Sequence, residues 1–360
     1  MKQNLMQKII VAVMAMAATQ VAVAESWRIH HVANMGAHFA SINEAMASDQ
    51  VVDGDVLYLD AGCVLSDDQT ISKAVTVIGT GWDFTNRPYL AARLDKKLYI
   101  TAAATVSGLH VVGMVYPQCS DVVIERCLIQ GGVSQTDTKI VAQNVTIRQC
   151  GIEGNVKGAG KTATQTSEWK VYNSRVCSTT SNGAIYNLFG IEIVNNILRL
   201  SWYGSNTFNS NDVIQGVENA IIKNNIILNI SGQAADRKNQ NRIITAASNL
   251  QVYNNVFSAD STWGNFGTYP NNVFTGSIKQ TNFYVNSGSG GEWMRLVENS
   301  PAKGAGEGGI DCGPYAEGSL YPFVTYGMPQ NVYYPASAAV SARPTNDQVK
   351  VKLNIVNQKK

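Results

Sequence analysis

The central part of the chain repeats one short pattern. The second residue of a polar pair recurs after 23, 24, 22, 29 and 30 residues. An alternating apolar strand precedes each pair and an apolar pair follows it, in VVIERCLI (122–129), VTIRQCGI (145–152), WKVYNSRV (169–176), IEIVNNIL (191–198), IIKNNII (221–227) and LQVYNNVF (250–257). A period in this range, with strand-forming residues inside it, indicates a solenoid.

The repeat favours a parallel β-helix over other solenoids. Its strands are short and rich in β-branched residues, which argues against helical repeats. A leucine-rich consensus is absent, and a propeller blade needs a period of about forty residues. Coils of a β-helix stack about 4.8 Å apart, so equivalent residues lie above one another. We therefore expect one column of side chains, formed by Cys127, Cys150, Ser174, Asn196, Asn225 and Asn255.

The asparagines of this column are expected to form a ladder. Asparagine tolerates a left-handed backbone at a corner, and its amide can bond to the next amide in the stack. Asn-Asn pairs also occur in hairpin turns, but hairpins do not explain the repeated apolar pair or the period. Stacking also brings Cys127 and Cys150 within disulfide range, so both a bond and two buried thiols remain open.

Residues 39–315 resemble exported bacterial proteins of the pectin-lyase-like, parallel β-helix type. ASINEAM (40–46), with Ser41 and Glu44 in a capping-box pattern, looks like their capping helix. GDVLYLDAG (54–62) and TISKAVTVIGTG (70–81) resemble their first strands, and SPAKGAG (300–306) with DCGPY (311–315) resembles their closing segment. The resemblance implies an all-β, single-stranded, right-handed parallel β-helix with an N-terminal capping helix and a short C-terminal β tail. It implies no particular activity, because this fold carries lyases, hydrolases, epimerases and non-enzymes.

The N-terminus has the features of an export signal. Lys2 and Lys8 precede the apolar run 9–18, and Ala22-Val23-Ala24 fits a cleavage site. We therefore expect a signal peptide over 1–24, a β-helix with its cap over 25–315 and a C-terminal tail over 316–360. The tail is expected to cover or flank the far end of the helix, and its strand 348–356 to pair with 332–340. These features predict a secreted, periplasmic or cell-surface protein, and we expect a monomer.

Composition limits the partners. Removing the two lysines of the signal lowers the formal net charge from +2 to 0, and no basic stripe remains, which argues against nucleic acid. No other apolar run is long enough to span a membrane after cleavage. The chain has only four histidines and no metal-type cysteine spacing, so we expect no metal and no cofactor. His30-His31 is interpreted as exposed linker.

The ladder locates an outer face. Eleven residues before Asn196, Asn225 and Asn255 lie isoleucines that should point inward, so their neighbours Tyr186, Gln215 and Thr245 should face outward. The resemblance places a lyase site on this sheet. A lyase needs a cation or metal beside a base. This row is mostly neutral, and only Tyr186 could act as a base, although a structural tyrosine is the simpler interpretation.

Three long loops, 201–212, 231–242 and 259–272, should project from one edge and wall a groove along this sheet. Function concentrates in such loops. Their aromatic residues offer flat faces to sugar rings, although the same rings could pack the loops onto the coil: Trp202, Tyr203, Trp263 and Tyr269. Their charged residues are weak catalytic candidates, as a carboxylate pair or a lyase base: Asp212, Asp236, Arg237, Lys238 and Arg242.

The sequence therefore predicts an exported β-helix that binds a polysaccharide or other glycan along a loop-walled groove without catalysis. Tyr186, Trp202, Tyr203, Gln215, Trp263 and Tyr269 are the expected contacts. One alternative is a polysaccharide lyase or glycoside hydrolase that acts on an acidic or a plant or host glycan. Another is a surface adhesion module for a protein partner.

Overall fold

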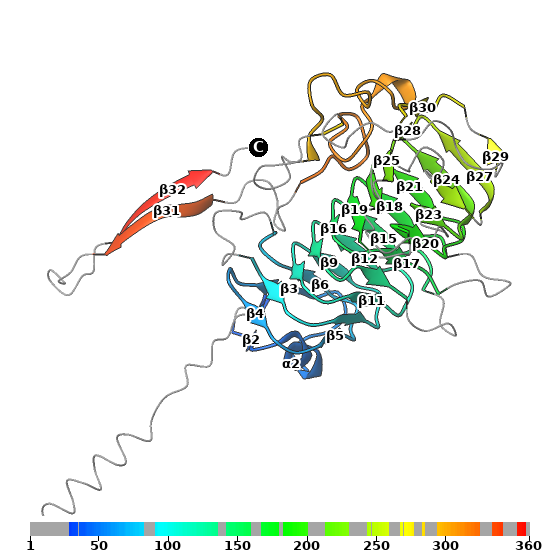
Figure 1. Ribbon diagram of the computed structural model, residues 1–360. Coiled ribbons are helices and arrows are strands. Elements are labelled where there is room, and N and C mark those ends of the chain that lie inside the picture. Colours follow the sequence, from blue (N-terminus) through cyan, green and yellow to red (C-terminus); the bar gives the residue numbers. More distant parts are fainter. Residues whose placement is uncertain are drawn as a thin grey trace, which may run out of the picture.

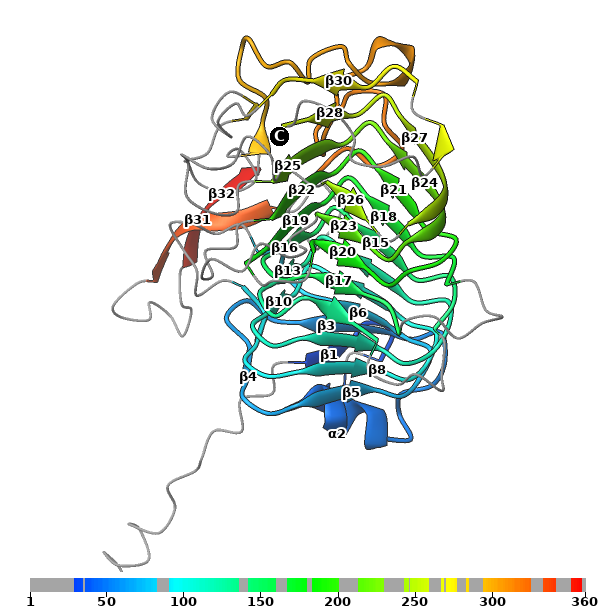
Figure 2. The same cartoon turned by 45° about the vertical axis from the view of Figure 1, so that its right-hand side comes forward.

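The computed structural model describes residues 29–34, 36–82, 91–135, 142–159, 167–179, 183–200, 213–229, 243–245, 247–258, 267–268, 270–276, 283–284, 294–324, 333–340 and 351–357. The protein is all-β apart from one α-helix and one 3-10 turn in these ranges. Its coils form a stack with three long sheets along it, here named A, B and C (Figures 1 and 2). The signal peptide expected over 1–24 lies outside the described residues.

Each sheet takes one strand from each coil. In spatial order, sheet A contains β2 (His38–Phe39), β1 (Ile29–His31), β3 (Val56–Leu59), β6 (Thr76–Ile78), β9 (Thr105–Ser107), β12 (Val123–Glu125), β15 (Thr146–Arg148), β18 (Lys170–Tyr172), β21 (Glu192–Val194), β24 (Glu218–Lys223), β27 (Ser248–Tyr253) and β29 (Gly267–Thr268). Sheet B contains β4 (Val64–Leu65), β7 (Arg93–Leu94), β10 (His110–Val111), β13 (Leu128–Ile129), β16 (Gly151–Ile152), β19 (Arg175–Ser178), β22 (Ile197–Leu200), β25 (Ile226–Asn229), β28 (Val256–Phe257) and β30 (Val273–Phe274). Sheet C contains β5 (Gln69–Ile71), β8 (Leu98–Ile100), β11 (Val115–Pro117), β14 (Val133–Ser134), β17 (Val156–Lys157), β20 (Ile185–Tyr186), β23 (Ile214–Gln215) and β26 (Ile244–Thr245).

The chain passes through sheets C, A and B in that order in each coil. Strands β20, β21 and β22, for example, are followed by β23, which returns to sheet C. Strands from β3 onward pair in parallel within the three sheets, which is consistent with the predicted parallel β-helix. Each strand buries alternate residues inside the coil, because successive side chains of a strand point to opposite faces. The inward-facing residues of sheet A form a column of β-branched side chains that are fully buried: Ile124, Ile147, Val171, Ile193 and Ile222.

The predicted asparagine ladder is present. The side-chain oxygen of Asn196 accepts the backbone N–H of Ser174 at 2.9 Å, and Asn225 accepts that of Asn196 at 2.8 Å. Asn255 accepts the N–H of Asn225 at 3.0 Å. Asn272 accepts that of Asn255 at 2.9 Å, which adds a rung that the sequence analysis did not include. The ladder therefore fixes how consecutive coils stack.

The left-handed residue is not the one expected. The first residue of each polar pair has a positive φ, as in Asn195, Asn224 and Asn254, and the second turns inward to form the ladder. A second corner, five residues earlier in each coil, is also left-handed. The paired corners are Asp121 and Arg126, Asn144 and Gln149, Glu168 and Asn173, Gly190 and Asn195, Asn219 and Asn224, and Asn249 and Asn254. The strand of sheet A lies between the two corners, and in β24 and β27 it begins one residue before the first of them.

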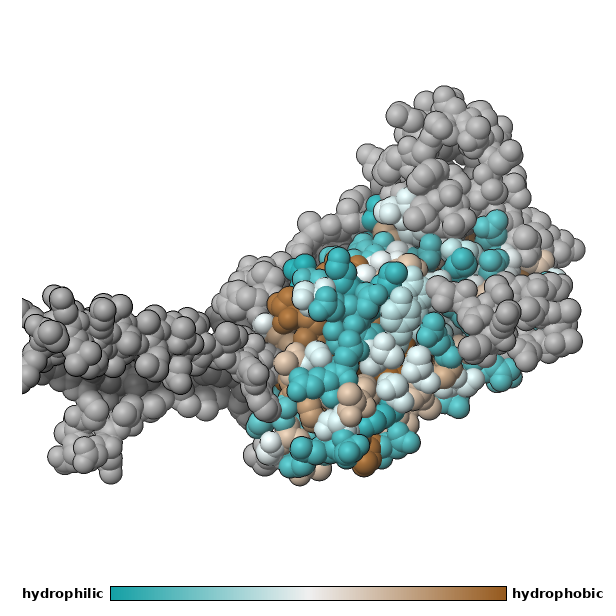
Figure 3. All heavy atoms as spheres, turned by 90° about the horizontal axis from the view of Figure 1, so that it is seen from below, coloured by the Kyte–Doolittle hydropathy of each residue, from teal (hydrophilic) through white to brown (hydrophobic). Residues whose placement is uncertain are grey.

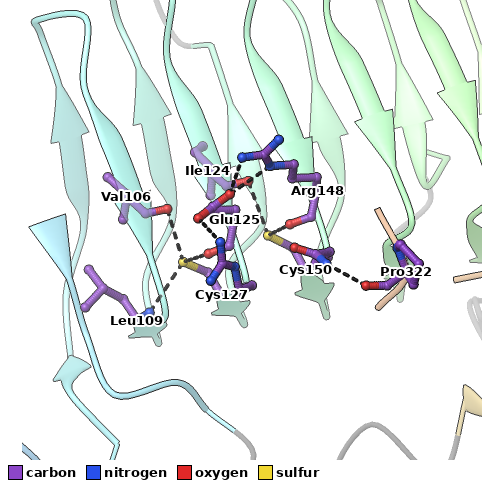
Figure 4. Close-up of polar contacts among 10 residues, drawn as sticks. Val106, Leu109, Ile124, Glu125, Cys127, Arg148, Cys150 and Pro322 are labelled. Carbon is purple, nitrogen blue, oxygen red and sulfur yellow. Dashed lines mark hydrogen bonds and ion pairs between the residues drawn. The ribbon is translucent and has the colours of Figure 1, made fainter. Parts of the chain in front are cut away.

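Cysteines continue the ladder as free thiols. The backbone N–H of Cys150 donates to the hydroxyl of Ser174 at 3.0 Å, and the sulfur of Cys127 accepts the N–H of Leu109 at 3.4 Å. Both thiols are fully buried and neither is in a disulfide (Figure 4). Complete burial, together with the thiol of Cys127, raises the pKa of Cys150. Of the two states left open by the sequence, the structure has the pair of buried thiols.

The helix α2 (Ile42–Ala47) lies at one end of the stack, as Figure 2 shows. The Ser41 hydroxyl accepts the N–H of Glu44 at 3.0 Å, while the Glu44 carboxylate accepts the N–H of Ala40, one residue earlier than in a standard capping box. Ile42, Ala45 and Met46 of this helix are buried. Viewed from this end, the described surface is mainly hydrophilic, with hydrophobic residues in separate patches (Figure 3).

The prediction that His30-His31 is exposed linker is wrong. Both residues belong to β1, which pairs antiparallel with β2 on one side and β3 on the other. His31 is buried, and its Nε2 lies 2.8 Å from the carboxylate of Asp55. A bond from the backbone N–H of Val52 and the contact with His31 hold the pKa of Asp55 below its usual value. The two strands extend sheet A beyond its first parallel strand.

The C-terminal part of the chain returns along the side of the stack. Ile197, Ile226 and Val256 point outward from sheet B into a second apolar cluster with Met294, Ala302, Cys312 and Phe323. The backbone carbonyl of Pro314 accepts the side-chain amide of Asn173 at 2.9 Å. The carbonyl of Pro322, labelled in Figure 4, accepts that of Gln149 at 2.6 Å. This segment contains the 3-10 turn η5 (Glu307–Gly309). Residues 314–323 thus lie against the side of the coils, whereas the sequence analysis expected the tail to cover or flank the far end.

The predicted pairing in the tail is confirmed. Strands β31 (Tyr333–Val340) and β32 (Val351–Asn357) form an antiparallel hairpin with a register irregularity at Pro335. In both views the hairpin projects away from the stack (Figures 1 and 2). In the part of the chain that the structure describes, no helix has the length and apolar character required to cross a membrane.

Candidate functional site

The outward row predicted on sheet C is present. Tyr186, Gln215 and Thr245 are direct partners on β20, β23 and β26. The isoleucines that precede them, Ile185, Ile214 and Ile244, are buried in the coil. The distance of eleven residues from the ladder therefore gives the correct register for these three coils.

The row continues toward the N-terminal coils. Lys157 is the partner of Tyr186, and Ser134 is the partner of Lys157. Tyr116 of β11 lies beside Tyr99 of β8, which in turn pairs with Thr70 of β5. From the N-terminal side, the described row reads Thr70, Tyr99, Tyr116, Ser134, Lys157, Tyr186, Gln215 and Thr245.

Aromatic rings and one cation dominate this row. The rings of Tyr99 and Tyr116 stack with centroids 5.1 Å apart and an interplanar angle of 17°. The ammonium of Lys157 lies 5.7 Å from the centroid of the Tyr186 ring, in the range of a cation–π contact. Tyr116 is 8% exposed and Tyr186 is 9% exposed, so both rings are packed and held in place. Tyr99 and Lys157 are half-buried, so the surface of this face offers mainly the Tyr99 ring and a positive charge, with the rings of Tyr116 and Tyr186 largely covered.

The described row is mostly neutral, as expected, but it contains one charged residue, Lys157, that the sequence did not place there. The count of eleven residues applies only to the coils of Asn196, Asn225 and Asn255, where the ladder follows the sheet C strand at a constant distance. In the coils of Val133 and Val156, residues 136–141 and 160–166 lie between sheets C and A and lengthen that distance. The apolar-polar pairs Val133-Ser134 and Val156-Lys157 were the signal that could have located these strands.

All nine contact and catalytic candidates predicted for the loops lie outside the described residues. These are Trp202, Tyr203, Asp212, Asp236, Arg237, Lys238, Arg242, Trp263 and Tyr269. The prediction of one loop over 259–272 is wrong, because Gly267–Thr268 forms β29 of sheet A and Asn272 belongs to the ladder. For the other two loops, the flanking strands show where they leave the coil. Segment 201–212 joins β22 to β23 and segment 230–242 joins β25 to β26, so both connect sheet B to sheet C. Segments 136–141 and 160–166 leave the opposite edge of sheet C, toward sheet A.

The chemistry available on the described row is limited. Lys157 is its one charged side chain among the eight residues above, and no carboxylate stands beside it there. A lyase would require a base next to the cation, and Tyr186 is the neighbouring hydroxyl. In the described part of the chain, no group of three or more His, Cys, Asp or Glu residues is placed to hold a metal ion.

The outer faces of the other two sheets are in part occupied. Sheet B carries the second apolar cluster. On sheet A, the ring of Tyr321 stacks on Tyr172 with centroids 5.8 Å apart and lies 4.4 Å from the guanidinium of Arg148. Lys223 pairs with Glu307 at 2.7 Å. The described contacts of residues 302–323 thus fall on sheets A and B and their turns, which leaves sheet C as the candidate face.

The buried carboxylate of Glu125 on sheet A is neutralised by two arginines. The carboxylate of Glu125 is bound between the guanidinium of Arg126, at 2.6 Å, and that of Arg148, at 2.5 Å (Figure 4 shows Glu125 with Arg148). Arg148 also contacts Tyr321 of the returning segment. This network holds the segment to the coil and offers no unpaired carboxylate for catalysis.

A scan of protein-family models, of curated proteins and of solved structures finds no match to this chain.

Proposed function

We propose that the protein is an exported glycan-binding β-helix of the pectin-lyase-like type, and that it holds a polysaccharide across the outer face of sheet C. The observation that carries this proposal is the row in which Tyr99, Tyr116 and Tyr186 accompany Lys157 in register. Binding sites combine apolar and aromatic walls with a few placed polar groups. Tyrosine rings offer such surfaces to a sugar, and Lys157 offers a partner for an acidic group.

The finer features of the fold belong to the same proposal. Connections between parallel strands of one sheet are right-handed with few exceptions, so we assign the coil a right hand. The position and burial of α2 support its role as an N-terminal cap, because a solenoid end otherwise exposes its apolar cross-section. The leader-like residues 1–24 support export to the periplasm, the cell surface or the medium.

Binding without turnover is the primary proposal, and polysaccharide lyase is the second candidate. The position of Lys157 beside Tyr186 favours the lyase among the enzymatic alternatives. Lys157 would neutralise a uronate carboxylate while Tyr186 exchanges a proton with the sugar. Against turnover stands the close packing of Tyr186, whose ring is 9% exposed.

The test compares two lysine–tyrosine pairs on different faces. Binding of oligouronates and of neutral oligosaccharides is measured by calorimetry for the wild type, Lys157→Gln and Tyr99→Ala. Lys223→Gln is the matched control, because Lys223 lies 5.6 Å from the ring of Tyr253 on sheet A. We expect Lys157→Gln to weaken oligouronate binding about tenfold, equal to about 1.4 kcal/mol, and Lys223→Gln to leave it unchanged.

Three results would contradict the proposal: no saccharide binding by the wild type, equal losses in both lysine variants, or binding to protein partners alone. The last result would indicate the adhesion module. Release of unsaturated uronates, detected by their ultraviolet absorbance, would move the assignment to the lyase. In that case Lys157→Gln and Tyr186→Phe should both abolish the signal.

A further inference from the structure

Three of the four histidines of the chain lie on the two strands that begin the fold. His30 of β1 and His38 of β2 are direct cross-strand partners, and their Nδ1 atoms lie 2.8 Å apart. Ile29 and His31, which flank His30, point inward and are buried, so His30 faces outward from sheet A. The two rings meet edge to face, with centroids 4.9 Å apart.

The carboxylate of Asp60 determines which ring nitrogen of His30 carries the proton. The Nε2 of His30 lies 2.9 Å from Oδ2 of Asp60, and an ionised carboxylate only accepts hydrogen bonds. The Nε2 therefore carries the proton, which leaves the Nδ1 of the neutral ring as a lone pair directed at His38. Histidines that bind metal ions commonly donate their other N–H to a carboxylate in this way.

From this geometry we propose that His30 and His38 form a two-histidine site for a divalent transition-metal ion, with Asp60 orienting His30. Two imidazole nitrogens 2.8 Å apart can share one proton or one metal ion. The site is open to water, because the side chains of His30 and Asp60 are 32% and 40% exposed. Water completes the coordination, since the described residues place no third protein ligand there.

The distance between the nitrogens selects the class of ion. With metal–nitrogen bonds of about 2.0–2.1 Å, a separation of 2.8 Å gives a nitrogen–metal–nitrogen angle of about 85°. A tetrahedral zinc site would need the nitrogens about 3.4 Å apart. An angle near 90° suits the tetragonal coordination of Cu²⁺ and Ni²⁺. The site therefore prefers these ions, and Ni²⁺ binds at least as tightly as Zn²⁺.

His31 does not belong to the site. Its Nδ1 accepts the backbone N–H of Asn34 at 2.9 Å and its Nε2 contacts Asp55, so both nitrogens are engaged. The remaining histidine, His110, lies on sheet B and serves as the control. Metal binding would tie β1 to β2 and stabilise the N-terminal edge of the fold, because an ion bound only by the folded state shifts the folding equilibrium.

The experiment titrates NiCl₂, CuCl₂ and ZnCl₂ into the full-length chain without an affinity tag. Binding is followed by calorimetry and by the melting temperature, with His38→Gln, Asp60→Asn and His110→Gln as variants. We expect one saturable site in the wild type, at least tenfold weaker binding in His38→Gln and about tenfold weaker binding in Asp60→Asn. His110→Gln should bind as the wild type does.

The site would be overturned by any of three results: no saturable binding, unchanged affinity in His38→Gln, or an equal loss of affinity in His110→Gln. Clearly tighter binding of Zn²⁺ than of Ni²⁺ would overturn the tetragonal geometry. A measurement on the wild type covers the case in which a variant fails to fold. Ni²⁺ should protect His30 and His38, but not His110, from acylation by diethyl pyrocarbonate, as mapped by mass spectrometry. Equal labelling with and without Ni²⁺ would refute the proposal.

Discussion

Replacing Asn225 by leucine tests the ladder at its centre. Asn225 is fully buried. Its side-chain oxygen accepts the backbone N–H of Asn196 at 2.8 Å and the amide of the same residue at 3.0 Å. Its own amide donates to the carbonyl of Ile193 at 2.8 Å and to the side-chain oxygen of Asn255 at 2.9 Å. Leucine has a similar size and can make none of these bonds.

The expected cost follows from the groups left without partners. The backbone N–H of Asn196 loses its acceptor, and the carbonyl of Ile193 loses this donor. Each unsatisfied buried group costs about 1–3 kcal/mol. Burial of the leucine methyls offsets part of this cost, although a tightly packed coil limits the gain. We expect the free energy of unfolding to fall by about 2–4 kcal/mol.

The assay is equilibrium urea unfolding, with Asn249→Gly as the matched control. Asn249 also donates from its amide to an asparagine of the preceding coil, Asn219, at 2.6 Å, but this bond is exposed. Glycine accepts the left-handed backbone of Asn249, so the control should change stability by less than about 1 kcal/mol. If Asn225→Leu costs less than about 0.5 kcal/mol, or no more than the control, the ladder does not stabilise the stack as argued.

Three further predictions concern other parts of the fold. Burial, aided by a nearby arginine, lowers the pKa of His110 from 6.5, so the unfolded chain takes up this proton first. The urea midpoint should therefore be highest above pH 6.5 and fall as the pH drops below 6.5. His110→Gln should flatten this pH dependence, and an unchanged dependence in the variant would contradict the reasoning. Tyr321→Ala removes the stacking on Tyr172 and should cost about 1–2 kcal/mol and speed proteolysis within 314–324, whereas unaltered cleavage would show that the segment is held elsewhere. Burial raises the pKa of Cys312 to about 12, so iodoacetamide at pH 8 should modify the half-buried Cys119 before it, and the reverse order would count against the described packing.

The stacking of the coils could be predicted from the sequence, because the residues that form the ladder are recognisable by type and by spacing. Each Asn-Asn pair supplies a left-handed corner and a buried amide, so pairs at a regular period predict parallel strands directly. The prediction that the second asparagine of each pair is the left-handed residue was wrong, because either asparagine can adopt a positive φ. Only the buried carbonyls and N–H groups around Asn196 and Asn225 distinguish the two positions.

The candidate site was harder to predict because its row crosses coils of different length. Lys157 and Tyr116 belong to the same row as Tyr186 because the sheet C strands pair in register. Their distance along the sequence from the ladder residue differs from coil to coil, so counting from the ladder does not find them. The two N-terminal histidine strands were missed for another reason. Residues 29–31 and 38–39 are too short to show a period, and their pairing with β3 is a tertiary effect.

The constant separation of the two left-handed corners has a consequence for engineering. From β12 to β28, the variation in coil length falls on the paths from sheet C to sheet A and from sheet B to sheet C, while the six corner pairs keep the same spacing from Asp121–Arg126 to Asn249–Asn254. Foreign peptides grafted at the variable connections should leave the stacking intact, because loop length costs little free energy. A single residue added between Asn219 and Asn224 would rotate every following side chain of that strand to the wrong face.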